Sequence, residues 1–108
     1  MSDLEEYKGQ AIELAAGVEY AAGSVVSKTI LDKKTGTLTL FAFDKGQGLS
    51  EHTSPYDATV QIVDGTAELT VGGKPNVVKA GQLFIMPAQV PHSLRAVERF
   101  KMLLIMIR

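Results

Sequence analysis

The sequence predicts an all-β fold, a single antiparallel β-barrel or jelly roll, and three observations support this prediction. Short runs rich in valine, isoleucine, threonine and leucine alternate with turns that contain glycine or proline. Between these runs no segment repeats its apolar residues with a helical period. The chain has 108 residues, of which 45% are hydrophobic, and this is enough for one core. Short strands without intervening helices favour a sandwich or a closed barrel.

The predicted strands follow an N-terminal extension at residues 1–16. A short helical turn is expected at residues 2–7, because a serine and an aspartate at its start can cap it. We expect one domain over residues 1–108, with its core at about residues 24–107.

The first two predicted strands are residues 24–31 and 37–43, and the second alternates before it becomes apolar on both faces. Asp64-Gly65 and Gly72-Gly73 indicate turns, so a meander of antiparallel strands is predicted in the middle of the chain. The other predicted strands are residues 58–63, 67–71, 77–78, 83–86, 94–97 and 100–107.

The last predicted strand, residues 100–107, is apolar on both faces. Methionine and leucine occupy the even positions from 102 to 106, and leucine and isoleucine occupy the odd positions from 103 to 107. A barrel wall needs only one apolar face. We therefore predict a homodimer, joined through sheet faces or edge strands.

Composition and charge exclude several classes of protein. The chain has no cysteine, so disulfides and thiolate metal sites are excluded. The amino terminus is acidic and polar, unlike a secretory signal, and no apolar run is long enough to span a membrane, so we expect a cytoplasmic protein without membrane contact. The net charge is −1, and lysines and arginines are scattered among acids. Nucleic acid is therefore not expected as a partner.

Glycine, proline and histidine recur with the spacing of a known family. A first set of positions is Gly46, His52, Ser54, Ala58 and Gly65, and a second set is Gly81, Pro87, Gln89, His92 and Ala96. This frame resembles the two motifs of the cupins and covers roughly residues 37–107. The resemblance implies a small β-barrel with an interior site, where the family binds a divalent metal such as manganese, iron, nickel or zinc through three histidines and a glutamate.

The candidate metal ligands are His52 and His92, which occupy two ligand positions of the cupin frame. Ser54 and Ala58 stand where the resemblance implies the other histidine and the glutamate, and an alanine cannot bind a metal. Asp57 is a candidate third ligand, because a bulge near the adjacent proline would turn it inward. The alternative is that Asp57 points outward and accepts backbone hydrogen bonds within a turn.

The predicted pocket combines these histidines with small and apolar side chains, and its residues are Ser54, Tyr56, Ala58, Met86 and Met102. Methionines on late strands also suit plain core packing, and Tyr56 also suits an exposed loop. We expect a metal-binding cupin that acts on or binds a small organic molecule. The alternatives are a non-catalytic protein that binds or senses a small molecule or anion, and a purely structural module.

Overall fold

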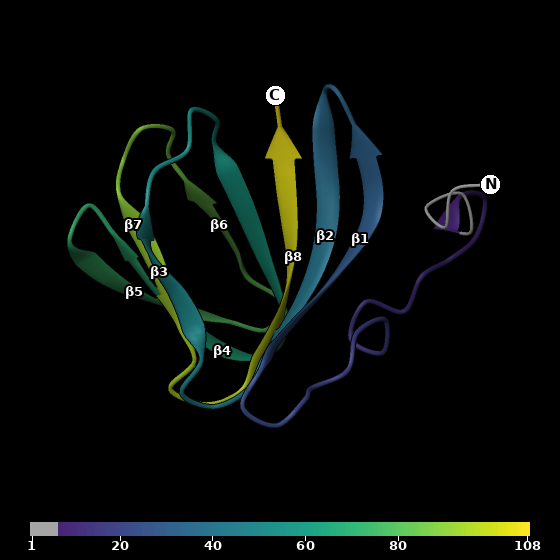
Figure 1. Ribbon diagram of the computed structural model, residues 1–108, viewed down its shortest axis with the longest axis horizontal. Coiled ribbons are helices and arrows are strands. Elements are labelled where there is room, and N and C mark those ends of the chain that lie inside the picture. The colour runs from purple at the N-terminus through teal and green to yellow at the C-terminus, as the bar shows by residue number, and fades with distance from the viewer. Residues whose placement is uncertain (1–6) are drawn as a thin grey trace.

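The computed structural model describes residues 7–108, and its regular elements are strands (Figure 1). The helical turn expected at residues 2–7 lies outside the described residues except for Tyr7. None of the described residues forms a helix long and apolar enough to cross a membrane. The strands are β1 (Val25–Lys33), β2 (Gly36–Phe43), β3 (Gly48–His52), β4 (Ala58–Val71), β5 (Lys74–Lys79), β6 (Leu83–Met86), β7 (His92–Arg95) and β8 (Phe100–Ile107).

The strands form one curled antiparallel sheet in the order β1-β2-β8-β4-β7-β3, and β5 and β6 also pair with β4. Figure 1 shows the result as a cup, with β1, β2 and β8 on one wall and β3, β5 and β7 on the other. This arrangement confirms the predicted all-β barrel or jelly roll. Two predicted strands, at residues 83–86 and 100–107, match β6 and β8 at both ends.

Strand β4 joins the two walls, and here the predicted meander is wrong. Asp64-Gly65 does not end a strand, because β4 runs without interruption through both residues. Its first half pairs with β6 and β8, and its second half pairs with β5 and β7. The pairing with β8 shifts register between Ile62 and Asp64, and Gly65 has a φ of 74°. A bulge and a left-handed glycine therefore bend this one strand from the first wall of the curled sheet into the second.

The turn predicted at Gly72-Gly73 is present between β4 and β5, with Val71 paired to Lys74. Both glycines have positive φ, 58° and 78°, as the tight hairpin turn with the twist of the strands requires.

The main core lies between the two walls of the cup. Its largest members are Phe43 and Phe100, whose rings stack with centroids 4.6 Å apart. Neither ring has solvent exposure. The pair lies where β2 ends and β8 begins, and the aliphatic and methionine side chains of β4, β6 and β8 belong to the same core.

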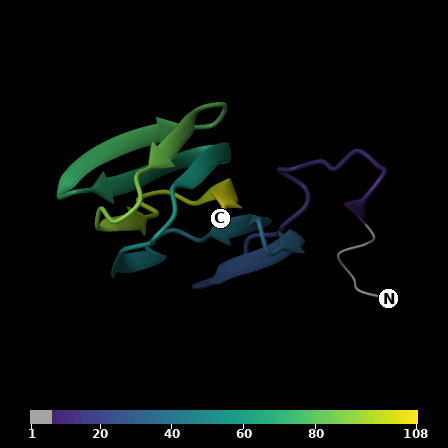
Figure 2. The ribbon, with the colours of Figure 1, turned by 90° about the horizontal axis from the view of Figure 1, so that it is seen from above.

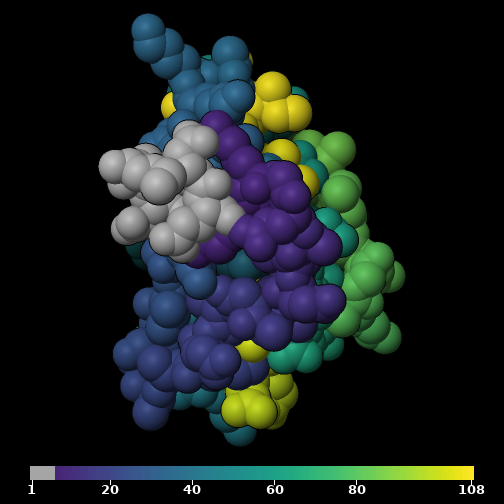
Figure 3. All heavy atoms as spheres, turned by 90° about the vertical axis from the view of Figure 1, so that its right-hand side faces the viewer, coloured from purple at the N-terminus to yellow at the C-terminus, as the bar shows by residue number. Residues whose placement is uncertain are grey.

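A second, smaller core lies on the outer face of β1, β2 and β8. It contains Val18, Ile30, Leu40 and Ala42, against which the N-terminal segment packs Tyr7, Ile12 and Leu14. Figures 2 and 3 show this segment beside and over the strands rather than among them. Part of the second apolar face of β8 is therefore covered by the chain itself.

The N-terminal segment is tied to the barrel around Tyr20. The Tyr20 hydroxyl donates a hydrogen bond of 2.6 Å to Asp64, and the Arg99 guanidinium lies 4.6 Å from the centre of the Tyr20 ring. The ammonium group of Lys101 also lies over this ring and donates to the carbonyl oxygen of Ala15. Burial and the hydrogen bond to Asp64 together raise the pKa of Tyr20 well above its usual value.

Candidate functional site

His52 and His92 are directly opposite each other across β3 and β7. Their ring centroids are 4.4 Å apart, and the ring planes meet at 70°. His92 is buried, with 3% of its surface exposed, whereas His52 is exposed at the end of β3. One member of the pair is therefore buried and the other is exposed.

Backbone carbonyls determine which ring nitrogen of each histidine carries the proton. Nδ1 of His52 lies 2.7 Å from the carbonyl oxygen of Ser50, and Nδ1 of His92 lies 3.2 Å from that of Val90. A carbonyl oxygen only accepts, so each Nδ1 must donate. In the neutral ring the lone pair then lies on Nε2, the nitrogen that remains available to a ligand or metal.

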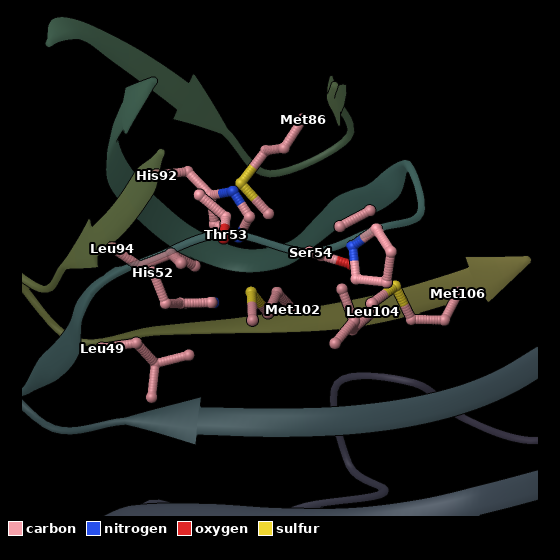
Figure 4. Close-up of a pocket in the computed structure, with 12 residues that line it drawn as sticks. Leu49, His52, Thr53, Ser54, Met86, His92, Leu94, Met102, Leu104 and Met106 are labelled. Carbon is pink, nitrogen blue, oxygen red and sulfur yellow. The ribbon is translucent and has the colours of Figure 1, made fainter. Parts of the chain in front are cut away.

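The two histidines line a cavity of about 300 Å³ between the walls of the cup. They come from β3 and β7, and the methionines that line the cavity come from β6 and β8, which both pair with the first half of β4 (Figure 4). No charged side chain is among the described residues that line it. The lining residues are Leu49, His52, Thr53, Ser54, Pro55, Ala58, Met86, His92, Leu94, Met102, Leu104 and Met106.

The loop before His92 is attached to the loop before β4. The amide of Gln89 donates to the carbonyl oxygen of Ser54 at 2.8 Å, and the amide of Ala88 donates to Oδ1 of Asp57 at the same distance. Gln89 has a φ of 66°, the only positive value among the described non-glycine residues. This position is a glycine in the cupin frame, and the left-handed backbone explains that preference.

The structure brings most of the predicted pocket residues together. Ser54, Ala58, Met86 and Met102 all line the cavity with the two histidines. Ser54 is nearly buried, and its hydroxyl accepts a hydrogen bond from the amide of Tyr56.

Two predicted site residues lie elsewhere. Asp57 accepts the hydrogen bond from Ala88 and lines an outer groove, together with Tyr56 and Ile85. Tyr56 is 41% exposed in that groove. Asp57 therefore follows the alternative in which it accepts a backbone hydrogen bond outside the cavity, and the register shift of β3 lies between Leu49 and His52 rather than near Pro55.

Leu49 and Leu94 line the cavity although the sequence did not suggest them. They are paired across β3 and β7, and the next pair in the register is that of His52 and His92. Leu49 and His52 are three residues apart, so simple alternation places them on opposite faces. The register shift between them reverses that alternation, and no local sequence signal announces it.

The donors present do not fit the metal centre that the cupin frame implies. Among residues 7–108 no group of three or more histidine, cysteine, aspartate or glutamate side chains is arranged to hold a metal ion. The remaining positions of that centre are a serine and an alanine, and Asp57 is bonded outside the cavity. Two neutral imidazoles alone are a weak site for a hard divalent ion.

The curled antiparallel sheet encloses a cavity between its two walls, and this architecture defines a small β-barrel protein with an interior site. A family model described as a cupin domain matches residues 39–108. Because this match covers more than half of the chain, the protein belongs to the cupin family, as the spacing of glycine and histidine predicted.

Solved structures extend the likeness over most of the chain. A conserved protein of unknown function from Streptococcus pyogenes is 37% identical, with a TM-score of 0.87, over 93% of this chain and 88% of its own. A cupin 2 conserved barrel domain protein from Leptotrichia buccalis is 42% identical, with a TM-score of 0.87, over 90% of this chain and 47% of its own. A cupin superfamily protein from Desulfitobacterium hafniense is 25% identical, with a TM-score of 0.86, over 93% of this chain and 92% of its own. A search among curated proteins returned no match.

Proposed function

We propose that this cupin binds a small, mainly apolar organic molecule in the cavity between its walls, with His52 and His92 as the polar contacts. The observation that carries the proposal is the lining itself: apolar side chains on most sides, and two imidazoles with unpaired Nε2 atoms at one end. A pocket with few but convergent polar groups is typical of small-molecule sites.

The cavity restricts the size and chemistry of the ligand. Its volume of about 300 Å³ lies at the lower end of the roughly 300–1,000 Å³ that is usual for ligand pockets, so the ligand is small. A neutral imidazole accepts through Nε2, which favours a ligand with a hydroxyl or amide donor at its polar end. When the rings are protonated, the same atoms donate and favour a carboxylate.

The three methionines that line the cavity provide the test. Methyl NMR of Met86, Met102 and Met106 should show saturable shifts when straight-chain alcohols or the matching carboxylates are added to chelator-treated protein. Leu104→Phe replaces a leucine of the cavity lining with a larger aromatic side chain and should weaken binding. Val77→Ala, at an exposed position of β5, should not. Absence of saturable shifts in the wild type, or equal affinity in L104F, would reject the proposal.

A metal-dependent activity is the second candidate, and the two free Nε2 atoms on one cavity favour it. Manganese, iron, nickel or zinc would be held by His52 and His92 with water in the other positions, and would supply a Lewis acid beside the organic ligand. Metal analysis of protein purified without a chelating tag tests this candidate. Stoichiometric metal that is lost in both His52→Ala and His92→Ala supports it, and equal metal content in all three proteins rejects it.

We further propose that two copies of the chain pair through the outer face of β6 and β8. Ile85 and Ile105 both pair with Thr59 of β4, so the two isoleucines lie on either side of Thr59 on the same face of the sheet. Leu83, Ile85 and Ile107 are more than half exposed, whereas the N-terminal segment already covers the neighbouring part of the sheet. A second copy is the occupant that the apolar character of both faces of β8 favours.

A further inference from the structure

We propose that the organic ligand of the cavity carries a primary carboxamide as its polar end. This inference rests on the proposed function, the binding of a small and mainly apolar molecule, and names the head group that His52, His92 and Ser54 hold. A primary carboxamide differs from an alcohol and from a carboxylate, because its NH2 group donates two hydrogen bonds and its carbonyl oxygen accepts.

The two histidines present acceptors to the ligand. Their Nδ1 atoms lie 2.7 and 3.2 Å from the carbonyl oxygens of Ser50 and Val90, so the backbone uses the proton of each neutral ring. Neither Nε2 atom has a hydrogen-bond partner among residues 7–108. Each Nε2 is therefore an acceptor that needs a donor from the ligand.

The spacing of the two rings suits two donors on one nitrogen atom. The ring centroids of His52 and His92 are 4.4 Å apart, and both rings reach into the cavity (Figure 4). Two acceptors that bind the same NH2 group lie about 5 Å apart, since each hydrogen bond is about 2.9–3.0 Å long. A single hydroxyl group would leave one of the two imidazoles without a donor.

The absence of charge in the lining favours a neutral head group. No aspartate, glutamate, lysine or arginine is among the described residues that line the cavity. An ammonium group also donates several hydrogen bonds, but its charge would have no counterion there, and burial of an unpaired charge costs far more than burial of a neutral polar group. A carboxylate only accepts, so it cannot satisfy two neutral imidazoles.

Ser54 provides the donor that the carbonyl oxygen of a carboxamide needs. Ser54 lines the cavity and is only 8% exposed. Its Oγ accepts a hydrogen bond of 3.1 Å from the amide of Tyr56, and its own proton has no acceptor among residues 7–108. A buried donor without a partner is costly, so a ligand that accepts from it gains affinity. Two acceptors and one donor thus match the two N–H groups and the carbonyl oxygen of a primary carboxamide.

The competing explanation is that apolar contacts alone hold the ligand, and three probes with the same tail separate the two. Pentanamide has two N–H donors, whereas N-methylpentanamide and pentan-1-ol each have one. Burial of apolar area alone would rank N-methylpentanamide first, because it has an additional methyl group. Recognition of a primary carboxamide ranks pentanamide first. Because pentan-1-ol has a smaller head group than pentanamide, steric exclusion cannot explain a preference over both of the other probes.

The experiment measures dissociation constants by methyl NMR of the chelator-treated full chain at about pH 8, which favours neutral imidazole. We expect pentanamide to bind about 10-fold more tightly than either other probe, the effect of one additional hydrogen bond. His52→Phe keeps a ring but has no acceptor, so it should abolish this preference. Glu51→Ala is the matched control, because Glu51 is exposed on β3 and does not line the cavity, and it should keep the preference.

Ser54→Ala should weaken both amides by a similar factor of about 10-fold, because both lose the contact to their carbonyl oxygen. Three results would overturn the carboxamide: another probe that binds the wild type as tightly as pentanamide, an undiminished preference in H52F, or unchanged amide affinity in S54A. Saturable binding of the probes in the wild type together with any of these results leaves the proposed function intact. If none of the three probes gives saturable shifts, both proposals are rejected.

Discussion

His52 and His92 are opposite each other in one strand pair, with ring centroids 4.4 Å apart, although one side chain is exposed and the other is 3% exposed. The two rings therefore contribute differently to stability while they share one site. Both line the cavity, but His92 is buried in the barrel and His52 is exposed at the end of β3.

This asymmetry predicts different costs for the two alanine variants in metal-free protein. His92→Ala should lower the free energy of unfolding by about 1–3 kcal/mol, because it removes a buried side chain. His52→Ala should change it by no more than about 0.5 kcal/mol, as is usual for exposed positions. Urea denaturation of both variants measures the difference. Equal costs would show that the burial of His92 does not contribute to stability.

Gly65 predicts a severe effect from a single added methyl group. A Cβ there would clash with the carbonyl oxygen of Arg99, in a backbone with φ of 74°. Gly65→Ala should therefore cost about 2–5 kcal/mol, the sum of left-handed strain and overpacking. Gly73 has a similar φ of 78° but open space around it, so Gly73→Ala should cost only about 1–2 kcal/mol. Denaturation midpoints that do not differ would show that β4 does not need its bend.

Tyr20 predicts a stability change at high pH. Its pKa is raised in the folded state, by burial first and then by the hydrogen bond to Asp64. The folded state therefore holds the proton more tightly, and the resulting stabilisation is complete below the unfolded pKa of about 10 and is lost as the pH rises above it. Tyr20→Phe should lower stability by about 1 kcal/mol at neutral pH, the usual net value of a hydrogen bond.

The measurement is the free energy of unfolding of wild type and Tyr20→Phe between pH 7 and about pH 11. The two curves should converge at the alkaline end, because only the wild type loses this interaction. Parallel curves over the whole range would contradict the proposed role of the hydroxyl group.

Restoring the two missing donors of the cupin frame should raise the affinity of the cavity for manganese or zinc. Ser54 and Ala58 both line the cavity with the histidines. The double variant Ser54→His/Ala58→Glu should bind manganese or zinc at least about 100-fold more tightly than the wild type, because each change adds a direct ligand. The metal should raise the melting temperature, whereas the metal-free variant should be less stable than the wild type, because it buries an unpaired carboxylate.

Calorimetry with manganese and zinc, together with thermal melts, checks this prediction. Ala58→Gln is the matched control, because the glutamine side chain is similar in size to that of glutamate but carries no charge. If the double variant gains no affinity, positions 54 and 58 do not face the histidines in solution.

The exposed face of β6 and β8 predicts a dimer. Light scattering at micromolar concentration should give a mass about twice 11.6 kDa. Ile85→Lys combined with Ile107→Lys should give monomers, because it places two charges in the proposed contact. Val77→Lys, on an equally exposed position of β5, should remain dimeric. A mass near 11.6 kDa for the wild type would reject the dimer.

The sequence by itself determined the fold class and the family. Strand alternation and turn glycines are local properties, so the strands at residues 83–86 and 100–107 were predicted with their correct ends. The spacing of His52 and His92 in the cupin frame depends only on counting residues, and it led to the family that the comparison shows.

Only the tertiary structure decided how these elements are used. Asp64-Gly65 has the composition of a turn, yet long-range pairing with β8 keeps it inside one bent strand. Asp57 could have faced either way, and the amide of Ala88, which is 31 residues away, holds it outside the cavity. Leu49 faces inward because of a bulge that no local pattern announces. Each outcome depends on partners distant in the chain, so local propensity cannot determine it.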